Sequence, residues 1–123
     1  MIEALPAPDH VAAFRVAGIA NASDYDEVIP AIEKKLQQHD SIAVLADLTE
    51  LEDITAAAVR RDIQYGLNKL GELHRFKRAG VISDKQWVKV AAGLTDALFP
   101  ELDARVFSAD EKQEALRWVS AAE

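Results

Sequence analysis

The segment Val44–Ile63, VLADLTELEDITAAAVRRDI, decides the fold because it predicts a buried strand, an acidic loop and a helix in immediate succession. Its strand belongs to the run Ser41–Leu48, which is apolar on both faces until Asp47, as in a central strand covered on both sides. Thr55 has the position and side chain of a helix N-cap. The helix after it carries one apolar stripe made of Val59, Ile63, Leu67 and Leu70.

The residues before this segment predict a hairpin and a helix. Ile2–Leu5 and Val11–Gly18 are strand-like runs separated by a proline-containing turn, so we expect them to pair antiparallel. Ser23 followed by acidic residues indicates the start of a helix that runs to His39. Pro30 is expected to kink or divide this helix, because proline cannot donate a hydrogen bond to the preceding turn.

The residues after the segment repeat the alternation of strand and helix. A strand is predicted at 75–83, a helix at 84–99 that ends before Pro100, a short edge strand at 103–108 and a last helix with Leu116, Trp118 and Val119. Ser83 with Gln86, and Ser108 with Glu111, have the spacing of capping boxes. The predicted order is therefore β-β-α-β-α-β-α-β-α.

Strands separated by helices are joined by right-handed crossovers, which place parallel strands in one sheet. We therefore expect an α/β fold with a mostly parallel sheet of about five strands and an antiparallel N-terminal hairpin. No tract rich in glycine, serine or proline divides the chain, so residues 1–123 are interpreted as one domain.

Composition excludes several classes of function. The net charge of -7 opposes binding to nucleic acid, whose affinity for proteins comes from lysine and arginine. The absence of cysteine excludes disulfides and thiolate chemistry. No apolar run approaches the ~18 residues of a membrane span, and no targeting segment is recognised, so we expect a soluble cytoplasmic protein.

One short span is basic in spite of the overall charge. Its cations are Arg60, Arg61, Lys69, His74, Arg75, Lys77 and Arg78. The favoured interpretation is a solvated helix face and strand rim, and the alternative is a patch that receives an acidic partner or an anionic headgroup.

No group of residues predicts catalysis. The three histidines, His10, His39 and His74, lie in different predicted elements without the spacing of metal ligands. Carboxylates crowd the loop at 47–53, where two of them could act as acid and base, but acidic solvated turns at strand ends are common. Glycine-rich phosphate-binding motifs are absent. We therefore expect a protein that is not an enzyme and needs no cofactor or metal.

The loop resembles the corresponding segment of STAS domains, the anti-sigma factor antagonists, in which a D-L-S/T-x-L-x-x-I pattern precedes D-S-S-G. The matching residues are Asp47, Leu48, Thr49, Leu51 and Ile54. The running order of motifs along nearly the whole chain resembles the SpoIIAA-like family of small bacterial and archaeal proteins. The resemblance implies a STAS-like fold and a regulatory interaction with a partner protein.

The helix start departs from that pattern. In anti-sigma factor antagonists the second serine of D-S-S-G is phosphorylated, whereas this chain has Thr55, Ala56, Ala57 and Ala58 at those positions. Ala57 has no hydroxyl, so the resemblance does not carry the serine switch over. Phosphorylation of Thr55 or Thr49 is a minor alternative.

Two hypotheses follow. The first is a non-enzymatic binding or regulatory module that recognises a partner protein through Asp47, Thr49, Asp53, Thr55, Ala57, Arg61 and Tyr65. The second starts from the surplus apolar surface of helix 84–99, which could cover a small apolar ligand or lipid, or touch a membrane weakly. Its candidate residues are Trp87, Val88, Ala91, Leu94, Leu98 and Phe99. A homodimer interface is the simpler use of the same surplus.

Overall fold

The computed structural model describes residues 1–122, with Thr95 described without its side chain; Glu123, the last residue of the predicted domain, lies outside the described residues. The strands are β1 (Ile2–Ala4), β2 (Val11–Val16), β3 (Gly18–Ala20), β4 (Ile42–Asp47), β5 (Leu51–Ile54), β6 (Phe76–Ile82) and β7 (Ala104–Phe107). The helices are α1 (Tyr25–Gln38), α2 (Ala56–Asn68), α3 (Gln86–Leu98) and α4 (Lys112–Ser120), with 3₁₀ turns η1 (Ala22–Asp24), η2 (Leu70–Arg75) and η3 (Ala109–Glu111).

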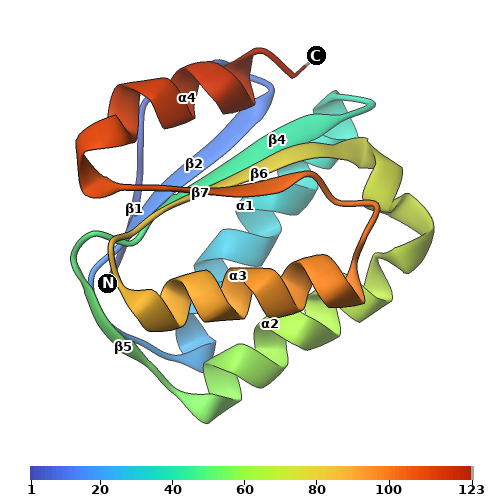
Figure 1. Cartoon of the computed structure of the whole chain (residues 1–123). Coiled ribbons are helices and arrows are strands. Elements are labelled where there is room, and N and C mark those ends of the chain that lie inside the picture. Colours follow the sequence, from blue (N-terminus) through green and yellow to red (C-terminus); the bar gives the residue numbers. More distant parts are fainter. Residues whose placement is uncertain (123) are drawn as a thin grey trace.

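The main sheet has the strand order β1-β2-β4-β6-β7 (Figure 1). β1 pairs antiparallel with β2, and the other neighbours are parallel. The predicted α/β class, the hairpin and the mostly parallel five-stranded sheet are therefore confirmed. β4 lies at the centre of the sheet, and β7 lies at an edge as predicted.

Helices cover both faces of the sheet, with α4 on one face and α1, α2 and α3 on the other (Figure 1). Alternate residues of β2 point to opposite cores, because successive side chains of a strand face opposite ways. Val11 and Ala13 contact the cluster that includes Val119 of α4. Ala12 and Phe14 belong to a second cluster with Ile32 and Leu36 of α1.

A small parallel pair of strands, β3 with β5, was not predicted from the sequence. β5 occupies part of what was interpreted as an acidic loop, and its Leu51 is buried. Gly18 supplies a φ of 71° at the start of β3, a conformation that favours glycine. Strands of three or four residues are too short to show a clear alternation, which explains why the pattern was missed.

The start of the first helix also differs from the prediction. Asn21, not Ser23, begins it: the Asn21 side chain and the Asp24 carboxylate form a reciprocal capping box around η1. Ser23 instead donates its hydroxyl to the Asn21 side chain. α1 continues through Pro30, so the predicted division of the helix is wrong.

Two other caps agree with the sequence. The hydroxyl of Thr55 accepts a hydrogen bond from the backbone N–H of Ala58 at 3.1 Å and begins α2. Ser108 and Glu111 form the predicted capping box before α4. Within residues 1–122, no helix combines the length and apolar character needed to cross a membrane.

Candidate functional site

A cavity of about 310 Å³ lies between the sheet and the three helices on its α1 side. Its walls come from the inner face of β2, β4 and β6, from α1 and from facing residues of α2 and α3. Most of the lining is apolar, and includes Phe14, Val16, Val28, Ile32, Val44, Ala46, Leu48, Leu51, Val81, Trp87, Val88 and Ala92. A predominantly apolar hollow with few polar groups is typical of small-molecule sites.

Burial along the central strands shows that solvent reaches this cavity. On β4 and β6, Leu45 and Ile82 face α4 and are buried, whereas Val44, Ala46 and Val81 face the cavity and are only half-buried. An inner strand face covered by helices is normally closed. The alternation is therefore a consequence of incomplete packing beneath α2 and α3.

Small side chains account for the unfilled space. Ala20, Ala46, Ala91 and Ala92 stand at lining positions where larger residues would close the gap between helix and sheet. On the α4 side, by contrast, Phe107 fills the corresponding layer and is buried. The two faces of one sheet thus differ in packing.

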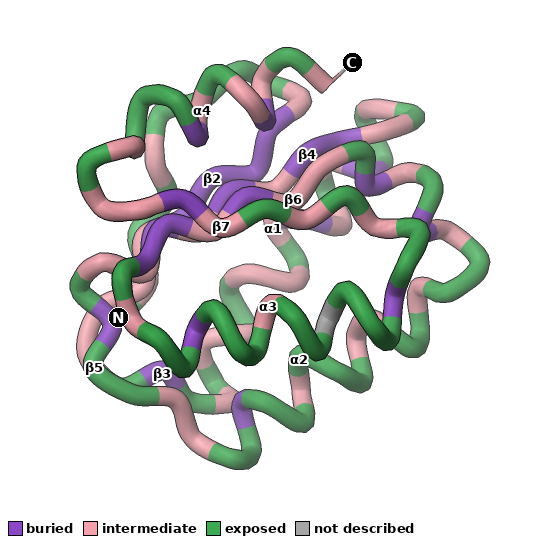
Figure 2. The backbone as a smooth tube through the Cα atoms, in the orientation of Figure 1, coloured by how far each residue is buried: buried purple, intermediate pink, exposed green. Residues whose placement is uncertain are grey.

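The cavity opens between α2 and α3. Asp62 of α2 and Trp87 and Ala91 of α3 line the cavity and are also exposed, so they mark its mouth. Both helices run side by side on this face of the molecule, and most of their surface is exposed (Figures 1 and 2).

α3 is held at its two ends. Val88 near its start and Phe99 just after its end are buried. The ring of Phe99 packs against Gly66 of α2. Between these two anchors Ala91 and Ala92 face the cavity, so this helix forms one wall of it.

The predicted lid residues therefore separate into three groups. Trp87, Val88 and Ala91 line the cavity. Leu94 and Leu98 are exposed and do not belong to the lining. Phe99 is buried against α2. The predicted stripe of Val59, Ile63, Leu67 and Leu70 is exposed as well; the first three residues lie on α2, and Leu70 begins η2.

Four polar residues line the cavity: Asp24, Tyr25, Asp62 and Tyr65. The Tyr25 hydroxyl lies close enough to the Asp62 carboxylate for the two groups to interact. Burial, and next the negative charge of Asp62, raise the pKa of Tyr25. Burial also raises the pKa of Asp62, and the interaction with Tyr25 offsets part of this rise.

Tyr65 has a buried hydroxyl oxygen that makes no hydrogen bond of good geometry within the described residues. Burial raises the pKa of Tyr65, and the nearby Glu33 carboxylate adds to the rise. Tyr65 was predicted as a partner-binding residue, whereas Tyr25 and Asp62 were not predicted as site residues. No local pattern links these two, because they meet only when α1 packs beside α2.

The predicted partner-binding loop is organised around a buried carboxylate. Asp47 is 2 % exposed and accepts hydrogen bonds from the Thr49 hydroxyl at 2.6 Å and the Thr49 N–H at 3.0 Å. The Lys112 ammonium lies 3.1 Å from it and the Arg15 guanidinium 3.7 Å. Burial opposes ionisation, but the contacts with Thr49 and Lys112 outweigh it and lower the pKa of Asp47.

The other predicted partner-binding residues do not gather at one site. Asp53 and Ala57 are exposed, and Thr55 caps α2. Arg61 contacts the Asp26 carboxylate at 2.9 Å and the Ala22 carbonyl. Tyr65 lines the cavity. Recognition of a partner by these residues stays a prediction.

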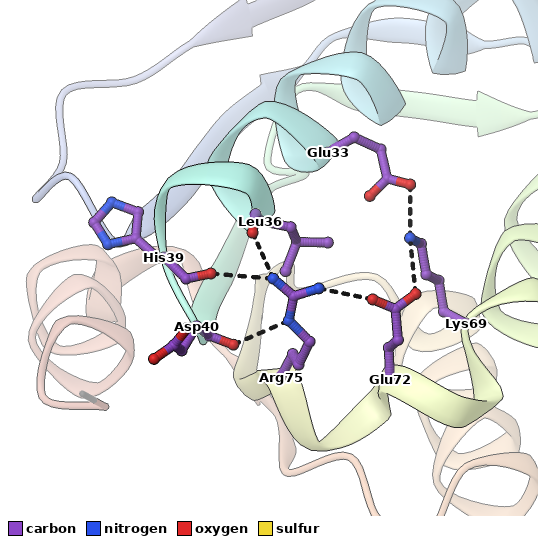
Figure 3. A network of polar contacts seen from close by, with 7 residues as sticks. All are labelled: Glu33, Leu36, His39, Asp40, Lys69, Glu72 and Arg75. Atoms are coloured by element: carbon purple, nitrogen blue, oxygen red, sulfur yellow. Dashed lines mark hydrogen bonds and ion pairs between the residues drawn. The ribbon is translucent and has the colours of Figure 1, made fainter.

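Much of the basic span is paired inside the protein (Figure 3). Arg75 donates to the backbone carbonyls of Leu36, His39 and Asp40 at the end of α1 and to the Glu72 carboxylate at 2.7 Å. Lys69 bridges the carboxylates of Glu33 and Glu72. These contacts favour a structural role.

A second cavity of about 320 Å³ lies between α1 and α2, with mostly polar walls. Its cations, Arg61 and Lys69, are the ones already paired with carboxylates. The histidines are also apart: His10 contacts the Ser120 carbonyl, and His39 contacts Asp9. Among the described residues, no cluster of three or more histidine and acidic side chains is arranged to hold a metal ion.

Comparison with known proteins agrees with this architecture. An uncharacterized protein of the DUF3478 family with a SpoIIAA-like fold, from Shewanella loihica PV-4, is 26% identical, with a TM-score of 0.73 over 97% of this chain and 92% of that one. The anti-sigma factor antagonist SpoIIAA in its unphosphorylated form is 8% identical, with a TM-score of 0.66 over 95% and 98% of the two chains.

An anti-sigma factor antagonist from Mycobacterium paratuberculosis is 22% identical, with a TM-score of 0.55 over 95% of each chain. At these identities, the likeness to both antagonists is one of fold. No curated protein matches the chain. The SpoIIAA-like family model matches residues 11–120, nearly the whole chain, and the protein therefore belongs to the SpoIIAA-like family.

Proposed function

We propose that this protein binds a small apolar ligand in the cavity between the sheet and α1, α2 and α3, and that it is not an enzyme. The observation that carries the proposal is the half-burial of Val44, Ala46 and Val81 on the inner face of the two central strands. An apolar surface of this kind is stabilised when an apolar molecule replaces water there.

The cavity volume sets the size of the ligand. An apolar cavity of ~150 Å³ holds one benzene molecule, so a cavity twice as large has room for roughly twelve non-hydrogen atoms. The exposed mouth between α2 and α3 gives a route of entry without unfolding of the core. Decanol, with its ten-carbon chain, is a suitable probe of this size.

Tryptophan fluorescence can report the binding. The chain has two tryptophans: Trp87 lines the cavity, and Trp118 lies on α4, where it stacks with Arg78 and Arg105. In the Trp118→Phe protein, emission therefore comes from Trp87. Decanol should change this emission in a saturable way and raise the unfolding temperature, because a ligand that binds the folded state stabilises it.

Ala92→Phe provides the specificity test. Ala92 lines the cavity, so a phenyl ring there should occupy the site and weaken decanol binding about tenfold or more. Ala97→Phe places the same ring at an exposed position of α3 and should leave binding unchanged. Equal binding by both variants, or no saturable response to decanol, would refute the proposal.

A second candidate function, recognition of a partner protein, is favoured by the exposed stripe of α2. Val59, Ile63 and Leu67 are 40%, 39% and 53% exposed, next to the exposed Asp53 and Ala57. Aligned apolar residues on a helix surface are common in protein interfaces. Dimerisation and weak membrane association are further predictions for the apolar surface shared by α2 and α3.

The two candidate functions are separable. Ile63→Lys removes part of the α2 stripe without touching a lining residue of the cavity. If the stripe binds a protein, this variant should lose a partner that the original chain retains in affinity purification, while decanol binding stays the same. A partner retained equally by both chains would argue against the stripe.

A further inference from the structure

The polar lining of the apolar cavity carries a negative charge and no positive one. Among the residues that line it in the described part of the chain, the ionisable groups are two carboxylates and two tyrosines, with no lysine, arginine or histidine. Lys85 directly precedes α3 and Lys89 lies within it, and neither lysine lines the cavity. A ligand with a positively charged polar end is therefore favoured electrostatically over one with a negatively charged end.

The two carboxylates, Asp24 and Asp62, differ in the contacts that they already make within the protein. Asp24 accepts the backbone N–H of Asn21 at 2.9 Å and so completes the capping box before α1. The Asp62 carboxylate interacts with the Tyr25 hydroxyl. No salt bridge to Asp62 is found among residues 1–122, since its neighbour Arg61 is paired with Asp26.

Asp62 also has the right place for the head of an amphiphilic ligand. It lies at the mouth on α2, opposite Trp87 and Ala91 of α3, while the apolar strand residues form the floor. A chain that enters between the helices would place its tail against the sheet and its polar end beside this carboxylate. Although Asp62 is exposed, the protein around its carboxyl raises its pKa by desolvation.

Each type of polar end has a different consequence at this position. A carboxylate or phosphate would stand beside the like charge of Asp62, and Arg61, the cation next to it in the sequence, is already paired with Asp26. An alcohol could donate one hydrogen bond to the carboxylate but would bring no positive charge to neutralise it. A protonated amine would donate a charge-assisted hydrogen bond and neutralise the Asp62 carboxylate, the strongest of the three interactions.

We propose that the ligand is an apolar amine, whose hydrocarbon part fills the cavity and whose protonated nitrogen binds the Asp62 carboxylate at the mouth between α2 and α3. This inference rests on the proposed function and names the chemical class of its ligand. The Tyr25 hydroxyl also lines the cavity and interacts with the Asp62 carboxylate.

Three probes with the same chain length test the inference: decylamine, decanol and decanoate, titrated into the Trp118→Phe protein with Trp87 emission as the signal. We expect decylamine to bind about tenfold more tightly than decanol, because only the amine pairs a positive charge with the Asp62 carboxylate, and decanoate to bind most weakly. Decanoate binding as tightly as decylamine would overturn the inference.

Asp62→Asn keeps the size of the side chain and removes its charge. It should bring the affinity for decylamine close to that for decanol, and decanol itself should lose less affinity than decylamine, because it brings no charge to pair with the Asp62 carboxylate. Asp96→Asn removes a carboxylate from α3 that does not line the cavity, and it should leave the order of the three probes unchanged. An unchanged preference for the amine in Asp62→Asn would overturn the inference.

Failure of the inference and failure of the proposed function give different results. If decanol binds and Ala92→Phe blocks it, but the amine has no advantage, the cavity binds apolar ligands of another class and only the inference fails. If none of the three probes changes Trp87 emission, the proposed function fails as well. Amine binding that survives Ala92→Phe would show attraction to the acidic surface and would also overturn the inference.

Discussion

The ring of Phe99, just after α3, lies 2.8 Å from the position that a Cβ atom on Gly66 of α2 would occupy. Because Gly66 has no side chain, the ring can pack directly on the helix backbone, and Phe99 is buried there. This contact fixes the end of α3 against α2, on the same side of the sheet as the cavity. The glycine is therefore required for close approach and not for an unusual backbone conformation.

Gly66→Ala should destabilise the protein by about 1–3 kcal/mol, because the new methyl group would force the buried ring to move. Gly93→Ala is the matched control: Gly93 also lies in a helix, but beyond its own helix backbone no described atom stands within 4 Å of the place that a Cβ would take. There the change should stabilise the fold by up to about 1 kcal/mol through helix propensity. Urea unfolding measures the change in the free energy of unfolding for both variants. Equal changes would contradict a specific packing contact between Phe99 and Gly66.

The Phe99→Leu background tests the cause of that loss. Leucine is shorter than phenylalanine, so the clash with an alanine at position 66 should be relieved. In this background Gly66→Ala should cost less than in the original protein, by about 1 kcal/mol or more, which a double-mutant cycle measures as coupling. Strict additivity would show that Gly66 acts through something other than the Phe99 ring.

Asp47 predicts a dependence of stability on pH. Its pKa is lowered in the folded protein from the ordinary value of 3.8, so the ionised side chain stabilises the fold above that value. This contribution is lost as the pH falls through the folded-state pKa, below about pH 4. The free energy of unfolding should therefore fall in this acidic window in part because of Asp47.

Asp47→Asn should remove that part of the pH dependence and lower stability at neutral pH by about 1.5–3 kcal/mol, the range for hydrogen bonds to a charged group. Glu52→Gln, which neutralises an exposed carboxylate of β5, should change stability by less than about 0.5 kcal/mol. Urea unfolding from pH 3 to 7 compares the three proteins. A variant as acid-sensitive as the original chain would refute the assignment to Asp47.

Arg75 predicts a stability effect that charge alone does not explain. Its guanidinium reaches carbonyls at the end of α1 and the Glu72 carboxylate together (Figure 3). Arg75→Ala should cost about 2–3 kcal/mol, and Arg75→Lys should restore little of this, because an ammonium group lacks the planar fork that spans several acceptors. Lys77→Ala, at an exposed position, should have little effect. Full rescue by lysine in thermal unfolding would contradict this interpretation.

The fold was predictable from the sequence because its strongest signals are local. The buried run of β4 and the caps at Thr55 and Ser108 depend on neighbours along the chain, and the structure confirms each. Asn21 was missed as a cap because both Asn21 and Ser23 are good N-caps, and only the path of the chain into η1 decides between them.

The candidate site was less predictable because it is a cavity, and a cavity depends on how completely side chains from separate elements fill the space between them. The stripe of α2 has the spacing of a core-facing helix, yet Leu67 is 53% exposed and does not line the cavity, because α2 presents Asp62 and Tyr65 to it instead. Tyr25 and Asp62 come together from separate helices. The surplus of apolar residues in α3 pointed to three residues that do line the cavity: Trp87, Val88 and Ala91. Such a surplus indicates a contact surface, but it does not show whether that surface borders a cavity or a flat interface.

The unfilled space itself predicts a gain in stability. Ala92→Phe should stabilise the unliganded protein by about 1–2 kcal/mol, because a ring placed in the cavity buries apolar surface that is otherwise only partly covered. Ala97→Phe exposes the same ring to solvent and should gain nothing, with a small loss from helix propensity. Urea unfolding of the two variants compares the same phenylalanine side chain at a cavity position and at an exposed position.

The same pair of variants connects stability to binding. Ala92→Phe should be more stable without decanol and should gain little when decanol is added, since the ring and the ligand compete for one space. The original chain should gain about 2.7 kcal/mol at a decanol concentration roughly one hundred times its dissociation constant. If Ala92→Phe instead lowers stability by more than about 1 kcal/mol, the residue is packed too tightly to admit a ring. The cavity would then be closed in solution, and a ligand could enter only by separating α3 from α2.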